Sequence, residues 1–230
     1  MIASPFQASV ILLAGGQDSR METDIPKQFL SLHGKTIALH SFEIFAACTY
    51  VREIIIVCEP QYQSLFPRFT IPHVHFALPG KRRQDSVYNG FQEISSSSDL
   101  ICIHDSTRPF IDKDNLEQLL IEAYRYGAAA LGVPTKSTIK EIDPNHFIQR
   151  TLDRSKLWEM HTPQAATPLL FQKGFEIALE YDLDLTDDAS IVELTGHPIK
   201  IVKDSYQNFK ITTPEDWQLA LRSSYQHEHL

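Results

Sequence analysis

Residues 9–30 of this chain read SVILLAGGQDSRMETDIPKQFL. The first five predict a buried strand, and Gly15 and Gly16 end it, because a backbone without Cβ atoms turns sharply and can bring its N–H groups against phosphate oxygens. Arg20 and Lys27 follow, and their charges do not depend on a local proton donor. The stretch therefore predicts a strand, a turn and a phosphate site. On the turn alone, an ordinary strand-to-helix connection with two solvated cations is an equal alternative.

The rest of the chain alternates short apolar runs with helical periodicity, which is typical of an α/β fold with a mostly parallel sheet and helices on both faces. We expect further strands at 53–58, 74–78, 100–104, 128–133 and 199–202. We expect helices at 36–48, from 84 to about 94, at 114–126, at 171–181 and at 187–194. Asp114 is expected to cap the third of these helices and Gly127 to end it. Thr213, followed by Pro214, predicts the start of a last helix.

The pattern changes between residues 137 and 154. Two short strands are expected at 137–142 and 147–152, and the turn-forming tripeptide Asp143-Pro144-Asn145 separates them. A parallel sheet does not require this β-hairpin. It is either a small lid or an arm that pairs with another subunit, and we favour the arm, in part because of the resemblance described below. We interpret residues 1–230 as a single domain that carries this arm.

The composition limits the classes of partner. The formal net charge is −8, so we do not expect the protein to bind nucleic acid, whose phosphate backbone favours a basic face. An acidic surface does not exclude a nucleotide enzyme, because a few local cations can serve one pocket. Cys48, Cys58 and Cys102 follow no metal-binding spacing, which favours a reducing cytoplasm. We see no secretion signal and no apolar run near the roughly 20 residues that cross a bilayer, so we expect no membrane partner and a cytoplasmic protein.

Residues that could bind a ligand or take part in catalysis follow several of the expected strands. In open α/β sheets, ligands bind at the carboxyl ends of the strands. The candidates at these positions are Gly15, Gly16, Arg20 and Lys27 after the first strand, Gly80, Arg83 and Ser86 after 74–78, Asp105 and Arg108 after 100–104, and Thr138 after 128–133, with Lys210 near the chain end. The pattern predicts cations, hydroxyls and one carboxylate along one edge of the sheet.

Most of these residues also have a purely structural interpretation. Asp105 either caps a turn or lies beside a triphosphate, where a hard cation such as Mg²⁺ would take oxygen ligands from it, from phosphates and from water. Arg108 is either a plain salt-bridging residue or an anion ligand. The tripeptide Thr162-Pro163-Gln164 is interpreted as a turn or as part of the site. Residues expected to be structural only are His104, for which we see no obvious partner, and the helix-capping acids Asp187 and Asp188.

Several motifs in the chain, in order, resemble one enzyme family. They are LxAGG…RM…PKQF, GxxRQDSV, HDSTRP, DRxxxWxxxTPQ, LTDDAS and NFKITxPED, and they extend over residues 8–220. The first resembles the signature loop of sugar-nucleotide pyrophosphorylases and cytidylyltransferases. Together they resemble the 2-C-methyl-D-erythritol 4-phosphate cytidylyltransferases of the non-mevalonate isoprenoid pathway. The resemblance implies a Rossmann-like fold whose β-arm clasps a second subunit in a homodimer. It also implies CMP transfer from CTP to a sugar-alcohol phosphate, release of pyrophosphate and a need for Mg²⁺.

The resemblance also implies roles for individual residues. Those implied for the nucleotide are Ala14, Gly15, Gly16 and Arg83, with Gly80 and Ser86 near the cytosine and Asp105 by the ribose and the metal. Those implied around the triphosphate, as the catalytic cations, are Arg20, Lys27 and Lys210. Those implied for the sugar phosphate are Arg108, Thr138, Thr162, Thr186 and Lys210, together with Arg154 from the arm of a second subunit. Two positions depart from the family pattern: Asp18 replaces a usual glycine, and Lys81 follows Gly80, where an acidic or small residue is common.

The implied reaction needs no general base. A phosphate monoester is largely dianionic near neutral pH because its second pKa is about 6, so the enzyme's task is to bring two polyanions together. Alternatives to this reading are a ribitol-5-phosphate cytidylyltransferase and a non-catalytic nucleotide-binding regulator. A nicotinamide dehydrogenase is disfavoured because the GxGxxG spacing is absent.

Overall fold

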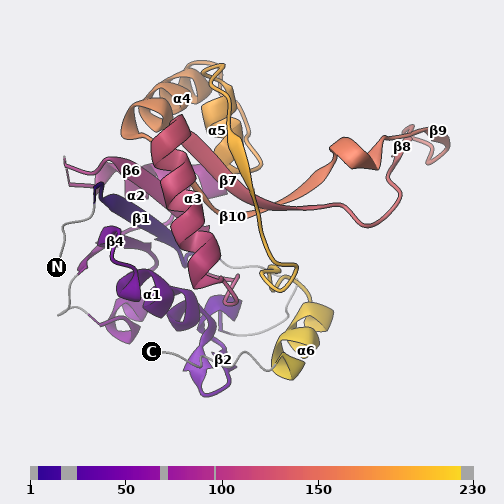
Figure 1. Ribbon diagram of the computed structural model, residues 1–230. Helices are drawn as coiled ribbons and strands as arrows, with labels where there is room; N and C mark the ends of the chain where they lie inside the picture. The colour runs from indigo at the N-terminus through magenta and orange to yellow at the C-terminus, as the bar shows by residue number, and fades with distance from the viewer. Residues whose placement is uncertain (1–4, 17–24, 68–71, 96, 224–230) are drawn as a thin grey trace.

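The computed structural model describes residues 5–16, 25–67, 72–95 and 97–223, and a seven-stranded sheet runs through it in the order β11-β7-β10-β6-β1-β4-β5 (Figure 1). The strands are β1 (Ala8–Leu13), β4 (Val51–Val57), β5 (His73–Ala77), β6 (Leu100–Asp105), β7 (Ala128–Pro134), β10 (Trp158–Ala166) and β11 (Lys200–Lys203). Only β10 is antiparallel to its neighbours in this sheet. The mostly parallel sheet expected from the sequence is confirmed.

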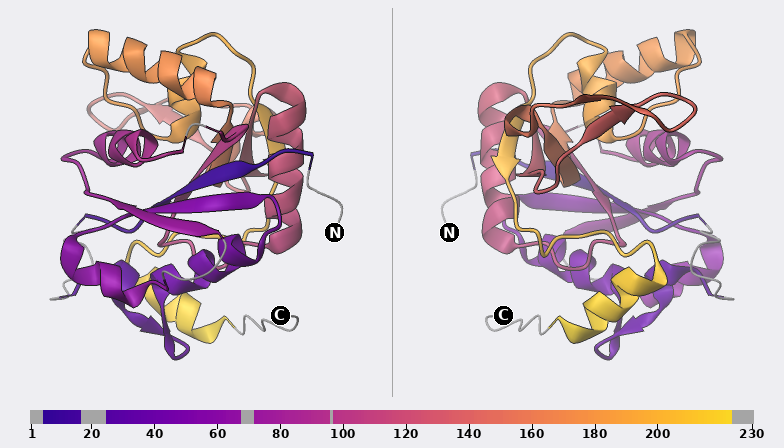
Figure 2. Two further views of the ribbon diagram at one scale, coloured as in Figure 1. Left: turned by 90° about the vertical axis from the view of Figure 1, so that its left-hand side faces the viewer. Right: turned by 90° about the vertical axis from the view of Figure 1, so that its right-hand side faces the viewer.

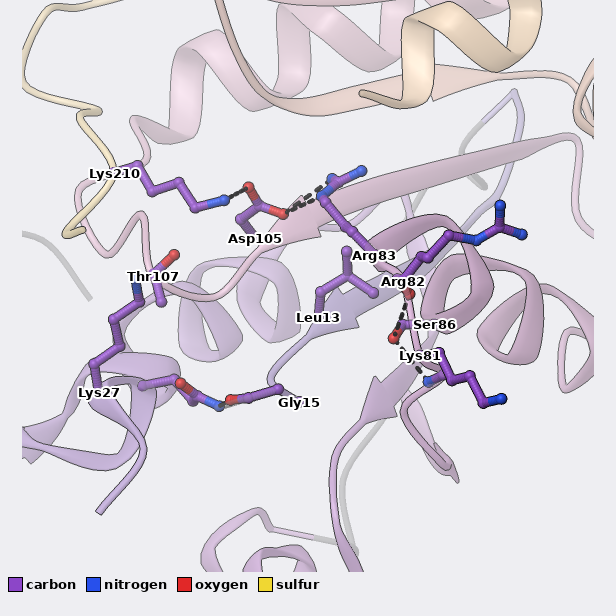
Figure 3. A pocket seen from close by; sticks show the side chains of 13 residues that line it. Leu13, Gly15, Lys27, Lys81, Arg82, Arg83, Ser86, Asp105, Thr107 and Lys210 are labelled. Carbon is purple, nitrogen blue, oxygen red and sulfur yellow. Dashed lines mark hydrogen bonds and ion pairs between the residues drawn. The ribbon is translucent and has the colours of Figure 1, made fainter. Parts of the chain in front are cut away.

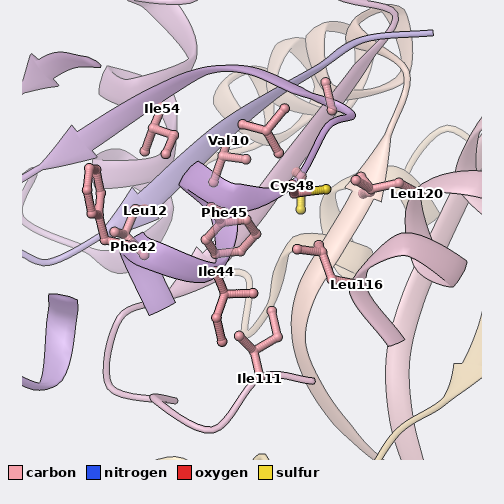
Figure 4. Close-up of a cluster of buried hydrophobic side chains, with 14 of the residues drawn as sticks. Val10, Leu12, Phe42, Ile44, Phe45, Cys48, Ile54, Ile111, Leu116 and Leu120 are labelled. Atoms are coloured by element: carbon pink, nitrogen blue, oxygen red, sulfur yellow. The ribbon is translucent and has the colours of Figure 1, made fainter. Parts of the chain in front are cut away.

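Successive side chains of the central strands point to opposite faces of the sheet. In β1, Val10 and Leu12 pack into one hydrophobic cluster, whereas Ile11 packs into another. Helices α1 (Ile37–Ala47) and α3 (Lys113–Tyr126) cover the first face, where Phe45 and Leu120 close the cluster (Figure 4). Helices α2 (Arg83–Gln92), α4 (Pro168–Glu180) and α5 (Asp188–Glu193) cover the second (Figure 2).

Two residues were expected to mark the ends of helix α3, Asp114 at its start and Gly127 at its end. Gly127 ends the helix with φ of 86°, as predicted. The predicted cap Asp114 is wrong: the cap is Asp112, whose side chain accepts the backbone N–H of Asn115 at 3.0 Å. Asp114 lies inside the first turn, where its charge still faces the positive end of the helix. Two acids within three positions satisfy the same rule, and only the one outside the helix can reach the free N–H group.

Strand β10 was not expected from the sequence. It lies between β7 and β6 and contains Thr162, Pro163 and Gln164, so the interpretation of these residues as a turn is wrong. Proline has no N–H to donate to a sheet and is found at bulges. The register of β10 against β7 shifts between Met160 and Gln164, which accommodates the proline. The shift in register explains how Pro163, a residue type that usually interrupts a strand, lies within a central strand.

The expected β-hairpin is present and projects away from the sheet (Figure 1). Its strands, β8 (Lys140–Ile142) and β9 (Ile148–Thr151), are shorter than predicted and pair antiparallel. Asp143 closes the turn by accepting the N–H groups of Asn145 and Phe147, each at 2.9 Å. All residues of β9 are exposed. The hairpin therefore forms an arm that contributes little to the core of this chain.

The remaining elements lie in the lower part of Figure 1, except for η4, which lies between the arm and β10. They are the hairpin β2 (Ser31–Leu32) and β3 (Lys35–Thr36), the 3-10 turns η2 (Lys27–Phe29), η3 (Pro60–Leu65) and η4 (Arg154–Lys156), and helix α6 (Pro214–Arg222). Thr213 caps α6 in a reciprocal capping box with Asp216, as the sequence predicted.

No helix among the described residues has the length and apolar character needed to span a membrane.

Candidate nucleotide site

A cavity of about 390 Å³ opens at the carboxyl ends of β1, β5 and β6 (Figure 3). It is lined by residues that directly follow these strands, by Lys27 and Gln28 of η2, and by Lys210 from near the chain end. The residues come from distant parts of the sequence because parallel strands end at the same edge of the sheet. The cavity lies where the sequence predicted a ligand.

The glycine turn forms one wall of this cavity. A Cβ atom on Gly15 would lie 2.4 Å from Cγ of Pro79, so only glycine fits there, and Gly16 has φ of 90°. Gln28, which is buried, donates from Nε2 to the carbonyl oxygens of Ala14 at 3.0 Å and Gly16 at 3.1 Å. Gln28 was not among the residues predicted for the site, although it stands in the PKQ motif. Its amide holds the turn in place.

Lys27 is in the 3-10 turn η2, and its side chain points towards Thr107 (Figure 3). Its side chain lines the cavity although the residue is only 5% exposed. Phe29 anchors η2, since its ring stacks on that of Tyr62 with centroids 4.0 Å apart. The predicted catalytic residue Arg20 and the departure at Asp18 lie outside the described residues.

The loop between β5 and α2 forms a second wall. Gly80 donates its backbone N–H to Oγ of Ser86 at 2.9 Å, and a Cβ on Gly80 would lie 2.4 Å from that of Asp85. The loop therefore folds tightly onto the start of α2. Lys81 lines the cavity as well, so the unexpected lysine is a feature of the site. Arg82 is paired with Asp85, whose carboxylate is 3.0 Å from Nη2.

Asp105 is the acidic residue among the described residues that line the cavity, and two cations hold its carboxylate. Oδ1 accepts Nε of Arg83 at 3.0 Å, and Oδ2 accepts Nζ of Lys210 at 2.8 Å. Burial alone would raise the pKa of Asp105, but Arg83 and Lys210 hold it well below its usual range. Asp105 is therefore a carboxylate throughout the physiological pH range and cannot serve as a proton donor.

The guanidinium of Arg83 also forms an ion pair with a second carboxylate. Its Nη1 and Nη2 atoms donate to the two carboxylate oxygens of Asp188 at 2.8 and 2.7 Å. The interpretation of Asp188 as a helix-capping acid is wrong, because Asp187 performs that function by accepting the N–H of Ser190. The role of Asp188 was not predicted from the sequence, since a pair of acids before a helix resembles two caps.

The guanidinium of Arg108 is hydrogen-bonded to backbone carbonyl oxygens. It donates from Nη1 to the carbonyl oxygen of Asn208 at 2.8 Å and from Nη2 to that of Met160 at 3.4 Å. Its Nε is buried without a hydrogen-bond partner, and no carboxylate within the described part of the chain forms an ion pair with it. Burial lowers the pKa of Arg108 from an ordinary value so high that the group stays charged. The alternative that Arg108 is a salt-bridging residue is therefore wrong for the described residues.

Thr162 lies behind Asp105 and does not line the cavity. Its hydroxyl accepts the backbone N–H of Asp105 at 3.0 Å and lies 3.1 Å from Nδ1 of His104. His104 has further contact with the carbonyl oxygen of Arg108, and burial lowers its pKa to about 4. It is therefore a neutral residue that packs the base of the site, and the partners that the sequence did not reveal are Thr162 and Arg108.

Of the six predicted acceptor residues, Lys210 lines the cavity, whereas the other five are absent from its described lining, namely Arg108, Thr138, Arg154, Thr162 and Thr186. Thr138, Arg154 and Thr186 are all exposed and lie outside the cavity lining. Thr138 and Arg154 belong to the arm, where Arg154 donates to the carbonyl oxygen of Lys136 at 3.0 Å.

The arrangement suits a bound polyanion. Basic side chains of the described lining outnumber acidic ones, with Lys27, Lys81, Arg82, Arg83 and Lys210 opposed to Asp105. Within the described residues, no group of three or more His, Cys, Asp or Glu could hold a metal ion by itself. A Mg²⁺ ion often takes only one or two carboxylates and completes its shell with water and substrate phosphates. Asp105 is the carboxylate that could join such a set, and a Mg²⁺ ion beside it would share oxygens that already accept from Arg83 and Lys210.

Comparisons with known proteins agree with one another. Residues 8–223 match the family described as 2-C-methyl-D-erythritol 4-phosphate cytidylyltransferase. The chloroplastic enzyme of that name from rice is 50% identical over 218 residues, covering 93% of this chain and 73% of the rice protein. That of Chlamydia pneumoniae is 41% identical over 214 residues, covering 93% and 97%. The crystal structure of the Thermus thermophilus enzyme is 27% identical, with a TM-score of 0.78 over 94% of this chain and 97% of that one.

Proposed function

The chain belongs to the 2-C-methyl-D-erythritol 4-phosphate cytidylyltransferase family, and from that premise we propose that it transfers CMP from CTP to 2-C-methyl-D-erythritol 4-phosphate in isoprenoid biosynthesis. Pyrophosphate is the second product. The observation that carries the proposal is the basic cavity behind the glycine turn, which Lys27 and Lys210 line from separate parts of the chain and where Lys210 pairs with Asp105. The family match favours this reading over the ribitol-5-phosphate enzyme and over a non-catalytic regulator.

We assign the nucleotide to this cavity. The backbone of Ala14, Gly15 and Gly16 would receive the phosphates, since a tight turn can present several N–H groups to one anion. Gly80 and Ser86 would lie near the cytosine, because their loop forms the opposite wall. Asp105 would lie at the ribose.

The chemistry follows from charge. A phosphate oxygen of the acceptor attacks the α-phosphorus of CTP, a new P–O bond forms, and the bond to the bridging oxygen breaks so that pyrophosphate leaves with the electron pair. Arg20, Lys27 and Lys210 would neutralise the charge that builds on the α-phosphate. No proton needs to move, because the attacking group is already a dianion. Mg²⁺, held by Asp105 together with phosphates and water, would supply further neutralisation of the triphosphate.

The acceptor would bind beside Arg108. No described carboxylate is in direct contact with its guanidinium, and Asp105 and Asp204 act on it only at longer range, so a phosphate would meet a positive charge without a close partner. We assign Thr138, Thr162 and Thr186, with Lys210, to the same substrate. Arg154 is proposed to come from a second subunit.

The proposed homodimer is supported by the shape and surface of the arm. At its tip, Ile142, Phe147 and Ile148 are 52%, 71% and 65% exposed, although all three are apolar. Exposed apolar groups on a projecting hairpin favour pairing with a second copy. Light scattering should give a dimer at micromolar concentration, and a monomer would remove Arg154 from the acceptor site.

We place the enzyme in the cytoplasm, since Cys48, Cys58 and Cys102 are free and buried, as is usual in a reducing compartment. The rice relative is named as chloroplastic. The position of a fluorescent fusion in the source cell distinguishes the two compartments.

A pyrophosphate-release assay tests the function. Each nucleoside triphosphate is combined with 2-C-methyl-D-erythritol 4-phosphate and with ribitol 5-phosphate. We expect release only with CTP and the first acceptor. Release with ribitol 5-phosphate alone identifies the alternative enzyme, and CTP binding without release identifies a regulator.

The catalytic cations are tested in the same assay. Lys27→Ala and Arg20→Ala should each lower kcat by about 10²–10³-fold, the usual effect of removing one preorganised donor. Lys173→Ala, at an exposed lysine of α4, is the matched control. Wild-type kcat in both site variants at saturating CTP contradicts the assignment.

A further inference from the structure

The ion pair between Arg83 and Asp188 connects the cavity to helix α5. Asp188 is fully buried, and both of its oxygens accept from the guanidinium, at 2.8 and 2.7 Å. A planar guanidinium that is held at two donors by one carboxylate loses its freedom to rotate. The orientation of Arg83 is therefore set from outside the cavity.

This orientation determines what Arg83 presents to Asp105. With Nη1 and Nη2 directed at Asp188, the Nε edge faces the other carboxylate, and Oδ1 of Asp105 accepts it at 3.0 Å (Figure 3). Lys210 fixes Oδ2 at 2.8 Å. Both oxygens of Asp105 are consequently held, one of them through Asp188.

The position of Asp188 is itself firmly held. The amide of Gln84 donates to the carbonyl oxygen of Leu183 at 2.8 Å and accepts the N–H of Leu185 at 2.7 Å, so the start of α2 is bound to the segment before α5. On the other side, Gly174 of α4 lets the two helices approach closely, since a Cβ there would lie 2.2 Å from the carbonyl oxygen of Ile191. Asp188 thus stands on a rigid support.

The same contacts decide how the charge of Arg83 is used. One guanidinium faces two carboxylates, so its charge is fully compensated before any substrate binds. The burial of Arg83 would lower its pKa, but Asp188 and Asp105 raise it above its ordinary value. An arginine in this state orients Asp105 and contributes little attraction to a triphosphate.

We propose that Asp188 is a positioning residue for CMP transfer, which acts through Arg83 to orient Asp105 and to keep the Arg83 guanidinium away from the triphosphate. This inference rests on the proposed function. Without the charge of Asp188, the guanidinium turns towards the phosphates. CTP and pyrophosphate then bind at least as tightly as before, while Asp105 loses its orientation and turnover slows.

The test is Asp188→Asn, which keeps the shape of the side chain and removes its charge. We expect kcat to fall by about 10- to 100-fold, the usual cost of disturbing a group that orients a reacting centre. KM for CTP should stay unchanged or fall, and inhibition by pyrophosphate should strengthen. The matched control is Asp187→Asn, since asparagine also caps helices well and Asp187 does not contact Arg83. It should leave kcat at the wild-type value.

A double variant separates positioning from a general effect on folding. If Asp188 acts through Asp105, then Asp188→Asn should cause no further loss of kcat in an Asp105→Asn background. A purely structural role would instead add its cost in both backgrounds and would raise the KM values of both substrates. That result, or a wild-type kcat for Asp188→Asn, overturns the proposal.

A second variant covers the case in which Asp188→Asn does not fold. Arg83→Lys leaves one ammonium group, which cannot hold both carboxylates in the forked geometry, so kcat should fall to a similar extent. A wild-type kcat for Arg83→Lys also overturns the proposal. Pyrophosphate release by the wild-type protein is measured first, so a failure of the proposed function is seen before any variant is compared.

Discussion

Replacing Gln28 by methionine should loosen the glycine turn, since it removes two hydrogen bonds at almost constant side-chain volume. The carbonyl oxygen that Gln28 reaches at 3.0 Å belongs to Ala14, which is 1% exposed, so water does not easily replace the lost donor. An unsatisfied buried acceptor costs about 1–3 kcal/mol. Gly16 is exposed, and water can take over the second bond. We therefore expect a loss of about 2 kcal/mol in the free energy of unfolding.

This loss has two measurable consequences. For a chain of 150–250 residues, each kcal/mol lowers Tm by roughly 2–4 °C, so thermal unfolding without nucleotide should shift downwards by about 4–8 °C. Fixing the backbone of one residue costs about 1–2 kcal/mol, so a turn that must be ordered by the ligand should raise the Kd for CTP by about tenfold, measured by calorimetry without acceptor.

The matched control is Gln172→Met. Gln172 is exposed on α4 and makes one hydrogen bond, to Glu176. If Gln28→Met unfolds at the same temperature as this control and binds CTP like the wild type, then Gln28 does not hold the turn and the reasoning is refuted.

The remaining predictions concern a helix end and a buried histidine. Asp112→Ala should cost about 0.5–2 kcal/mol because it removes the cap of α3, whereas Asp114→Ala should cost less; equal losses in chemical denaturation would contradict the assignment of the cap. The pKa of His104 is lowered from 6.5 to about 4 in the folded protein, so the unfolded chain binds the extra proton first as pH falls, and stability is lost between about pH 6.5 and pH 4. At roughly 1.4 kcal/mol per pKa unit, this residue should account for about 3 kcal/mol of that loss. Between pH 7 and pH 4, the free energy of unfolding of His104→Gln, measured by chemical denaturation, should fall by about 3 kcal/mol less than that of the wild type. An identical pH dependence of the two proteins would refute this role of His104.

Local signals predicted most of the elements. The alternation of apolar residues in β1 follows from the two faces of a buried strand, and Gly127 ends α3 because an αL residue is needed there. Thr213 and Asp216 are three positions apart and form a capping box by themselves. Such signals involve neighbouring residues, so they can be interpreted without knowing the fold.

Features that depend on distant residues could not be predicted in this way. Strand β10 contains Pro163, which argues against a strand until the bulge that accommodates it is known. The role of Gln28 depends on the carbonyl groups of a turn that lies 14 and 12 positions earlier. In both cases the residue type suggests one local structure, and the tertiary arrangement decides for another.

The two arginines of the site show why composition alone does not reveal a binding residue. Both Arg83 and Arg108 follow strands at the same edge of the sheet, and the sequence gives them equal standing. Arg83 meets Asp188, 105 positions away, and its charge is compensated. Arg108 meets only the carbonyl oxygens of Asn208 and Met160 among the described residues. An anion gains much more from the second arginine than from the first, because a compensated guanidinium must break existing ion pairs before it can bind. Whether an arginine orients a carboxylate or receives a phosphate therefore depends on whether the fold brings a carboxylate into direct contact with its guanidinium, as it does for Arg83, or leaves Asp105 and Asp204 at longer range, as it does for Arg108.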